Sequence, residues 1–234
     1  MKYLILTFTF IFSLNAFAEY RITFSASNLQ LPEEISESVE KIDCKYHHCY
    51  ALVNDRVWSV GRNGVGQLGR GDTTNQSTWR STGLSEILDV AAGGDHGYAL
   101  KNNGVVLSVG HNNYGQLGRN GTSDQYSWGL TGLSNVSGVY AGAMHGFVIK
   151  NNSTIWSVGR NDYGQLGRSG TTNQSNWGES NLSDVSYIAT AYYHNYVIRK
   201  DDKVWSVGNN NYGQLGLGDT TNRSEWTELA EPFN

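Results

Sequence analysis

Short apolar runs alternate with polar turns along most of the chain, and the whole pattern recurs at a fixed interval. One apolar run begins at corresponding positions about 49 residues apart, at Trp58, Leu107, Trp156 and Trp205. A period of this size is typical of stacked or radial repeats. No segment has a convincing helical period. The pattern therefore predicts a repeat protein built from β-strands.

Each repeat contains four short strand-like runs separated by turn residues. In the second repeat the first three strands are expected at 90–92, 98–100 and 106–109, with Asn102, Asn103 and Gly104 suited to a tight turn. A Gly-Gln-Leu-Gly loop follows the third strand, beginning at Gly66, Gly115, Gly164 and Gly213. A periodic tryptophan then opens the fourth strand, at Trp79, Trp128, Trp177 and Trp226. One repeat cannot bury its own apolar face, so the sequence predicts an all-β, β-propeller-like array of four repeats.

The first residues have a different pattern, that of a secretory signal peptide. Lys2 precedes an apolar run over 3–14, and Ala16-Phe17-Ala18 has the small-x-small form of a cleavage site. We expect cleavage after Ala18 and a secreted or periplasmic mature chain. The expected divisions are a signal peptide over 1–18, an N-terminal strand and linker over 19–39, the repeat domain over 40–229 and a C-terminal tail over 230–234.

Charge and cysteine content narrow the choice of partners. The formal net charge is -4, which argues against nonspecific binding to nucleic acid. No second apolar run is long enough to span a membrane. The cysteines are Cys44 and Cys49, too few for a tetrahedral zinc set. They form either a local disulfide, as an oxidising compartment favours, or two buried thiols.

The repeated loop carries a family resemblance. The segment Asn-(Asp/Asn)-Tyr-Gly-Gln-Leu-Gly, followed by Gly-Asp-Thr-Thr-Asn-Arg-Ser and preceded by a strand with a histidine, resembles the RCC1 (regulator of chromosome condensation) repeat. The resemblance covers about residues 40–229 and implies a β-propeller, which in that family usually has seven blades. The four RCC1-type repeats here leave three arrangements: a closed ring, an open arc, or two chains that complete a larger ring. A strand expected at 20–24 would pair with the last blade and seal the ring.

A histidine recurs beside a strand end in every repeat: His48, His96, His145 and His194. We expect a structural role for these residues, in which each ring hydrogen-bonds the backbone of its own or the next blade. The alternative is a ring of four imidazoles around the propeller axis, which would suit zinc, copper or nickel. No carboxylate accompanies the histidines, so the sequence predicts no metal and no cofactor.

Two sets of basic residues flank the Gly-Gln-Leu-Gly loops. The outer set is Arg70, Arg119 and Arg168, and the inner set is Arg62, His111 and Arg160; the fourth repeat has Leu217 and Asn209 instead. A one-sided basic arc would receive an acidic protein or an anionic glycan. In the alternative interpretation the arginines stack on the periodic tryptophans and support the fold. The loop tyrosines Tyr114, Tyr163 and Tyr212 suit a protein-binding hot spot, a sugar-stacking platform or packing between blades.

No catalytic motif stands out in the sequence. The Gly-x-Ser-x-Gly elbow, the phosphate-binding loop and the His-Glu-x-x-His motif are all missing. We therefore expect a non-catalytic, exported module that binds a protein or a glycan through one rim. The resemblance implies an alternative, guanine-nucleotide exchange on a small GTPase, which the signal peptide disfavours. The remaining alternatives are a secreted enzyme inhibitor and a metal-dependent enzyme that uses the histidines.

Overall fold

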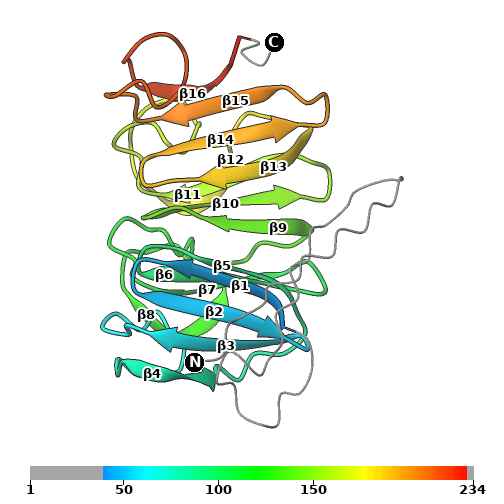
Figure 1. The fold of residues 1–234 in the computed structure, drawn as a ribbon, viewed down its shortest axis with the longest axis vertical. Helices are drawn as coiled ribbons and strands as arrows, with labels where there is room; N and C mark the ends of the chain where they lie inside the picture. The colour runs from blue at the N-terminus through cyan, green and yellow to red at the C-terminus, as the bar shows by residue number, and fades with distance from the viewer. Residues whose placement is uncertain (1–38, 231–234) are drawn as a thin grey trace, which may run out of the picture.

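The computed structural model describes residues 39–230, and every regular element in that part is a β-strand (Figure 1). The strands are β1 (Val39–Lys45), β2 (His48–Val53), β3 (Arg56–Gly61), β4 (Gln76–Ser81), β5 (Ile87–Ala92), β6 (His96–Lys101), β7 (Val106–Gly110), β8 (Gln125–Leu130), β9 (Val136–Ala141), β10 (His145–Lys150), β11 (Ile155–Gly159), β12 (Gln174–Glu179), β13 (Val185–Thr190), β14 (His194–Arg199), β15 (Val204–Gly208) and β16 (Arg223–Glu228). The all-β prediction is confirmed.

Each repeat forms one antiparallel sheet in which the four strands pair in chain order. We number these sheets as blades: blade 1 is β1–β4, blade 2 is β5–β8, blade 3 is β9–β12 and blade 4 is β13–β16. The first strands of successive blades pack beside one another along the inside of the array. The blades follow one another in an arc (Figure 1). This confirms the predicted propeller-like array of four units.

The arc is not closed by strand pairing within residues 39–230, because no strand of blade 4 pairs with a strand of blade 1 there. The described residues thus form a four-bladed arc whose ends are not joined by strand pairing, and the larger ring completed by two chains stays a prediction. The signal peptide over 1–18, the strand expected at 20–24 and residues 231–234 lie outside the described residues.

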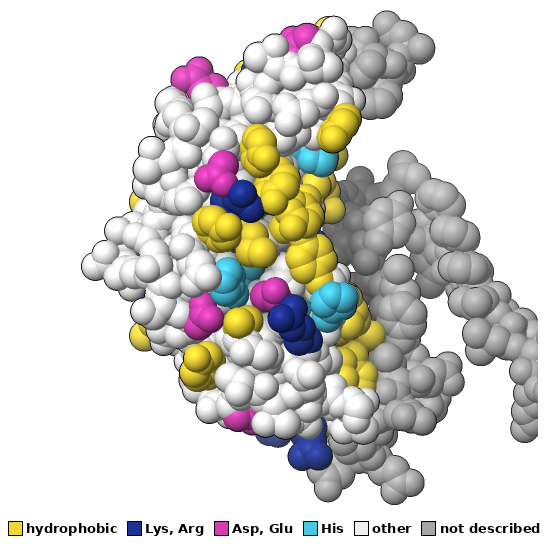
Figure 2. Space-filling model, turned by 90° about the vertical axis from the view of Figure 1, so that its left-hand side faces the viewer, with side chains coloured by type: hydrophobic (Ala, Val, Ile, Leu, Met, Phe, Trp, Pro, Cys, Tyr) yellow, Lys and Arg dark blue, Asp and Glu magenta, His cyan; other side chains and the backbone are white. Residues whose placement is uncertain are grey.

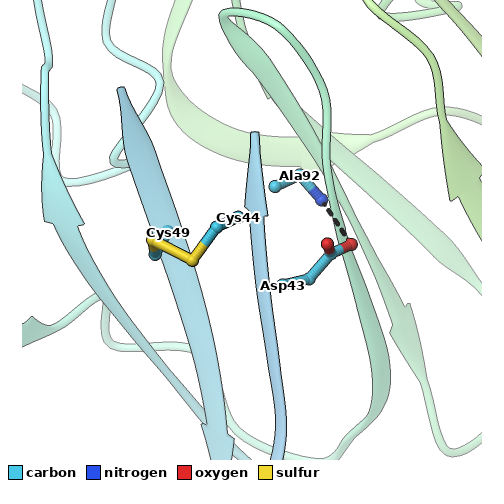
Figure 3. The surroundings of a disulfide bond; sticks show 4 residues. All are labelled: Asp43, Cys44, Cys49 and Ala92. Carbon is cyan, nitrogen blue, oxygen red and sulfur yellow. Dashed lines mark hydrogen bonds between the residues drawn. A yellow bond between two sulfur atoms is a disulfide. The ribbon is translucent and has the colours of Figure 1, made fainter. Parts of the chain in front are cut away.

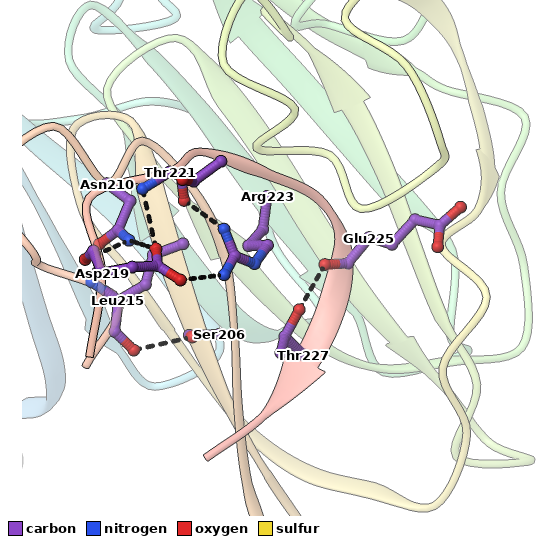
Figure 4. Close-up of polar contacts among 8 residues, drawn as sticks. All are labelled: Ser206, Asn210, Leu215, Asp219, Thr221, Arg223, Glu225 and Thr227. Atoms are coloured by element: carbon purple, nitrogen blue, oxygen red, sulfur yellow. Dashed lines mark hydrogen bonds and ion pairs between the residues drawn. The ribbon is translucent and has the colours of Figure 1, made fainter. Parts of the chain in front are cut away.

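Buried polar residues explain why the Gly-Gln-Leu-Gly loop repeats so faithfully. In blade 4, Asn210 Oδ1 accepts a hydrogen bond from the Leu215 backbone at 2.8 Å, and Ser206 Oγ donates to the Leu215 carbonyl at 2.9 Å (Figure 4). Asn210 Nδ2 also donates to the carbonyl of Asp219, 2.9 Å away. The other blades repeat the Asn and Ser bonds to the loop leucine, through Asn63 and Ser59, Asn112 and Ser108, and Asn161 and Ser157. All four loop leucines are fully buried: Leu68, Leu117, Leu166 and Leu215.

The periodic tryptophans of blades 2, 3 and 4 each join their blade to the blade before it. At the joint between blades 2 and 3, the Trp177 indole lies directly over Gly118, where a Cβ atom would collide with the ring. Its ring also lies 5.4 Å from the Tyr98 ring of blade 2. Trp128 and Trp226 have the same neighbours at the other two joints, which are Gly69 with Tyr50 and Gly167 with Phe147. The tryptophan and the last loop glycine are therefore one packing unit shared between two blades.

The third joint uses a different pair of residues for one hydrogen bond. The hydroxyls of Tyr50 and Tyr98 donate to the carbonyls of Gln67 and Gln116 at the first two joints. The rings of these tyrosines cover Gly97 and Gly146 of the following blade. At the third joint Phe147 has no hydroxyl, and Asn195 of blade 4 donates to the Gln165 carbonyl at 2.9 Å.

Cys44 and Cys49 lie opposite each other in the β1–β2 hairpin and are joined by a disulfide (Figure 3). Of the two alternatives for these residues, the structure therefore has the disulfide. The neighbouring Asp43 carboxylate accepts a hydrogen bond from the Ala92 backbone at 3.0 Å, which connects this hairpin to blade 2 (Figure 3).

Candidate binding surface on the inner turns

The four repeated histidines pack inside the blades. His48, His96 and His145 are buried, and His194 is half-buried. Each ring lies edge-on to the aromatic ring two residues further along its strand, at 5.1 Å for His96 and Tyr98. Burial lowers the pKa of His48 and of His145 to about 4, so both rings are neutral at pH 7. Within residues 39–230, no three His, Cys, Asp or Glu side chains are grouped as metal ligands.

The outer arginines do not form the exposed arc that the sequence suggested. Arg119 reaches back over its own blade, where its guanidinium donates to Ser108 and lies against Gly129. Arg168 donates in the same way to the carbonyls of Ser157 and Asn176. Burial lowers the pKa of Arg119 and of Arg168.

Arg70 differs from these two residues because its neighbour is Arg80, where blades 2 and 3 have glycine. Its guanidinium nitrogens are nevertheless enclosed. Arg119 and Arg168 therefore support the fold through hydrogen bonds to their own blades, and within residues 39–230 neither stacks on a periodic tryptophan as the alternative interpretation expected. The expected basic arc is reduced to the inner set.

The inner set lies beside the turns between the first and second strands of the blades, which we call the inner turns. The last two residues of these turns are Tyr46–His47, Gly94–Asp95, Ala143–Met144 and Tyr192–Tyr193. The first residue of each pair is small in the two middle blades and is tyrosine in the two end blades. The Tyr46 ring lies against Gly94, and backbone hydrogen bonds from Gly94 to Ala143 and from Ala143 to Ala191 connect blades 2, 3 and 4. The small residues let tyrosines from blades 1 and 4 meet across the middle of the arc.

The tyrosines form a continuous chain of ring contacts. Tyr46 of blade 1 lies 5.8 Å from Tyr192 of blade 4, and Tyr192 lies 4.2 Å from Tyr193. Tyr193 in turn lies 4.9 Å from Tyr163 of blade 3. Tyr46 and Tyr192 have 47% and 48% of their surface exposed, so this chain has an open outer side.

Arg160 connects the tyrosines at the centre of this surface. Its guanidinium lies 4.8 Å from the ring centres of both Tyr114 and Tyr193. It also donates to the Tyr193 hydroxyl at 2.9 Å and to the Asp162 carboxylate at 2.6 Å. Burial lowers the pKa of Arg160, but the bond to Asp162 more than offsets this and leaves a net rise. We call Tyr46, Tyr114, Tyr163, Tyr192, Tyr193 and Arg160 the tyrosine patch.

The surroundings of the tyrosine patch carry both signs of charge. Arg62 lies 3.6 Å from Asp95, whose carboxylate also accepts a hydrogen bond from Gln67. His111 lies 2.8 Å from the Gln116 amide and packs beside Tyr114. On this side of the molecule, hydrophobic side chains gather next to basic, acidic and histidine side chains (Figure 2). The surface is therefore aromatic and nearly charge-balanced, rather than the basic arc expected from the sequence.

The structure thus assembles part of the predicted binding set and adds residues to it. Tyr114, Tyr163 and Arg160 lie together, with His111 next to Tyr114. Tyr212 occupies the equivalent position on blade 4, but it is 92% exposed and outside the chain of rings. Sequence reasoning missed Tyr46, Tyr192 and Tyr193. The signal that would have found them is a departure from the repeat, since their counterparts in the middle blades are small or non-aromatic.

Comparisons with known proteins agree with this architecture. Two models of the regulator of chromosome condensation (RCC1) repeat match the chain, one over 87–116 and 185–214 and the other over 54–100 and 201–232. A comparison with curated protein sequences found no match. No helix long and apolar enough to cross a membrane occurs within residues 39–230.

Several solved structures share the fold at low sequence identity. Yeast RCC1 (Prp20), solved bound to Kap60, matches with a TM-score of 0.76 and 18% identity over 86% of this chain and 51% of its own. Human WBSCR16 matches with a TM-score of 0.76 and 19% identity over 86% of this chain and 55% of its own. Prp20p from Saccharomyces cerevisiae, described with its binding to Gsp1p and histones, has a TM-score of 0.73 and 18% identity over 84% and 51%.

Four antiparallel four-stranded blades with shared joints define a β-propeller-type repeat protein. The chain spans about half the length of the solved structures that it matches. The repeat matches lie in both halves of the array, so the chain contains RCC1-type repeats and has the fold of the RCC1 propellers.

Proposed function

We propose that the chain is an exported, non-catalytic RCC1-repeat protein that binds another protein through the tyrosine patch. One observation carries the proposal: side chains from all four blades converge into one exposed aromatic surface with an arginine at its centre. Tyrosine and arginine are, with tryptophan, the residues enriched in protein-binding hot spots. The ring contacts hold these side chains in place before binding, which lowers the entropy lost on association.

The charge balance indicates what kind of surface the partner presents. Arg160 is paired with Asp162, and Arg62 lies near Asp95, so neither arginine is an uncompensated cation. A strongly acidic partner would gain little from such a surface. We therefore propose a partner segment with apolar and neutral polar side chains that packs on the tyrosine rings. The solved relatives named above include yeast RCC1 in complex with a protein, Kap60, which is the same broad class of partner.

A glycan is the second candidate, because Tyr46 and Tyr192 present half-exposed rings on which a sugar can stack. Guanine-nucleotide exchange on a small GTPase has less support, since residues 1–18 have the pattern of a signal peptide. Export is a separate proposal with its own test. Mass spectrometry of the protein from the secreted or periplasmic fraction should give an N-terminus at Glu19. An intact Met1 on cytosolic protein would contradict export.

The binding proposal is tested by capture experiments with matched tyrosine variants. Wild type, Tyr46→Ala/Tyr192→Ala and Tyr212→Ala are used as baits on envelope and secreted extracts. Tyr212 is the control because it is an exposed loop tyrosine outside the patch. A protein captured by wild type and by Tyr212→Ala should bind the double variant at least about 30-fold more weakly, as for loss of a hot spot. Equal capture by all three baits would contradict the proposal, and glycan-array binding that depends on Tyr46 and Tyr192 would favour the second candidate.

A further inference from the structure

The three joints between blades are built from the same set of contacts. A backbone N–H just after the Gly-Gln-Leu-Gly loop donates to a carbonyl on the last strand of the next blade. The three pairs are Gly71 with Tyr126 at 2.7 Å, Asn120 with Ser175 at 3.2 Å, and Ser169 with Ser224 at 3.1 Å. The periodic tryptophan of the next blade covers the loop glycine and the aromatic ring described above. Every joint therefore has a donor face on the earlier blade and a tryptophan face on the later one.

Blade 4 has a donor face, but no following blade covers it within the described residues. Gly218 is the counterpart of Gly71, Asn120 and Ser169. At Gly216 the described residues that an added Cβ would meet are Leu229 and Tyr196 at the end of the same blade, whereas its three counterparts meet a tryptophan. Ile198 is 39% exposed, and its counterparts Leu52, Leu100 and Ile149 are 2%, 0% and 7% exposed.

Blade 1 presents the other half of a joint. It has a tryptophan face, but no blade precedes it within the described residues. Among residues 39–230, the apolar residues that Trp79 packs with are those of its own blade, such as Ala51 and Trp58. The neighbouring Ser77 and Thr78, on the edge strand β4, are exposed. Ile42 is half-buried, although its counterparts Val90, Val139 and Ile188 are at most 1% exposed.

We propose that the tryptophan face of a second copy of this chain docks on the donor face of blade 4. The choice of occupant rests on the repeat itself: each end presents the half of a joint that the other end lacks. Trp79 of the second copy would lie over Gly216 and Tyr196, and Gly218 would donate to the carbonyl of the second copy's Ser77. Two copies related by a two-fold axis would form both joints at once and close a ring of eight blades, which lies within the size range of propellers.

Pairing of two identical ends does not provide these contacts. Two donor faces would place N–H groups opposite N–H groups and would leave both loop glycines without a tryptophan. Two tryptophan faces would have no loop to cover. The association is therefore head-to-tail, with a different face of each copy in every joint.

The test uses one variant for each end of the arc. Ile198→Asp places a charge on the donor face, and Trp79→Glu places one on the tryptophan face. Leu130→Asp is the matched control, because Leu130 is 66% exposed and lies outside all joints. Mass measurement by light scattering and sedimentation should show a dimer for wild type and for Leu130→Asp. Each end variant should raise the dimer Kd about a hundredfold or more, because an unpaired charge is buried in the joint.

Mixing the two end variants separates head-to-tail association from pairing of identical ends. Ile198→Asp keeps its tryptophan face and Trp79→Glu keeps its donor face, so an equimolar mixture should regain a dimer through one intact joint. A wild type that is monomeric throughout, or that forms only assemblies larger than two, would overturn the proposal. So would a dimer that survives in either end variant, or a mixture that stays monomeric while both variants are folded by circular dichroism.

A second test, disulfide crosslinking between two copies, uses substitutions outside the blade core. Arg70 of blade 1 bridges to Ser127 of blade 2, and the corresponding pair between two copies is Leu217 with Thr78. Under mild oxidation, a mixture of Leu217→Cys and Thr78→Cys should give a crosslinked heterodimer at several times the yield of either variant alone. Equal yields in the mixture and in the single variants would overturn the proposal.

Discussion

The Gly-Gln-Leu-Gly loops and the inner turns lie next to each other on every blade, but they differ in how strictly they repeat. All four loops have the same buried Asn and Ser bonded to the same buried leucine. The inner turns instead change from Tyr46–His47 to Gly94–Asp95, Ala143–Met144 and Tyr192–Tyr193. The loops form the scaffold, whereas the turns form the tyrosine patch.

The difference has a physical cause. A loop residue meets the same neighbours in every blade, so any residue that fits one loop fits them all. An inner turn meets turns from other blades near the axis, and there its neighbours depend on its place in the arc. Tyr46 has room because Gly94 is small, and it reaches Tyr192 because blade 4 has a tyrosine there. In this protein, a site arises where the repeat is broken.

The largest expected effect on the scaffold is its pH dependence. His48 and His145 have a pKa of about 4 in the folded protein, against 6.5 for a free histidine, so the unfolded chain binds protons more readily. Stability should be highest above pH 6.5 and should fall as the pH decreases towards about 4, by up to about 3 kcal/mol for each ring. Urea unfolding at several pH values measures this loss.

The pH prediction is tested by removing one of the two rings, His145. His145→Gln should remove part of the slope between pH 6.5 and 4. Equal slopes for wild type and His145→Gln would contradict the burial argument.

The next effect concerns the repeated loop. Asn112 accepts a hydrogen bond from the Leu117 backbone and donates to the carbonyls of Gly121 and Ser123. Asn112→Ala leaves these buried groups without partners, so it should lower the free energy of unfolding by about 2 to 3 kcal/mol. The adjacent Asn113 is exposed, and Asn113→Ala should change it by less than about 0.5 kcal/mol. Equal urea midpoints for the two variants would show that the loop does not depend on the buried amide.

A double-mutant cycle tests whether the third joint can use the same donor as the first two joints, a tyrosine hydroxyl in place of the Asn195 amide. Asn195→Gly alone leaves the Gln165 carbonyl without its donor and should cost about 1 to 2 kcal/mol. Phe147→Tyr alone places a hydroxyl against the Asn195 side chain and should also destabilise the joint. The double variant recreates the Tyr-over-Gly arrangement of the first two joints, so it should recover at least about 1 kcal/mol relative to the sum of the single variants. Strict additivity would contradict the exchange of donors.

The smallest effect is expected at the tyrosine patch. Tyr192→Ala removes ring contacts with Tyr46 and Tyr193 on a half-exposed surface, so it should lower stability by about 1 kcal/mol or less. The Tyr46→Ala/Tyr192→Ala variant of the capture experiment should therefore remain folded at room temperature. A loss of several kcal/mol in thermal unfolding would instead place these tyrosines in the scaffold.

Much of the fold could be predicted from the sequence, because its causes are local. The period, the four strands of each blade and the joint tryptophan follow from spacings within one repeat. The loop glycines also follow, since Gly66, Gly115 and Gly164 have positive φ and lie against the next blade. The candidate site follows from the sequence only in part. The loop pattern indicates Tyr114, Tyr163 and Arg160, but it also predicts Arg119 and Arg168 on an exposed rim, whereas their side chains fold back onto their own blades.

The sequence by itself determined the blade, because each blade is specified by residues within about 50 positions of one another. Only the tertiary structure decided which arginines fold back onto their own blade and which remain at the surface. It also decided that Tyr46 meets Tyr192 and that the described array is an open arc with two different ends. The physical reason is that these properties depend on the curvature summed over several joints, which no single repeat specifies.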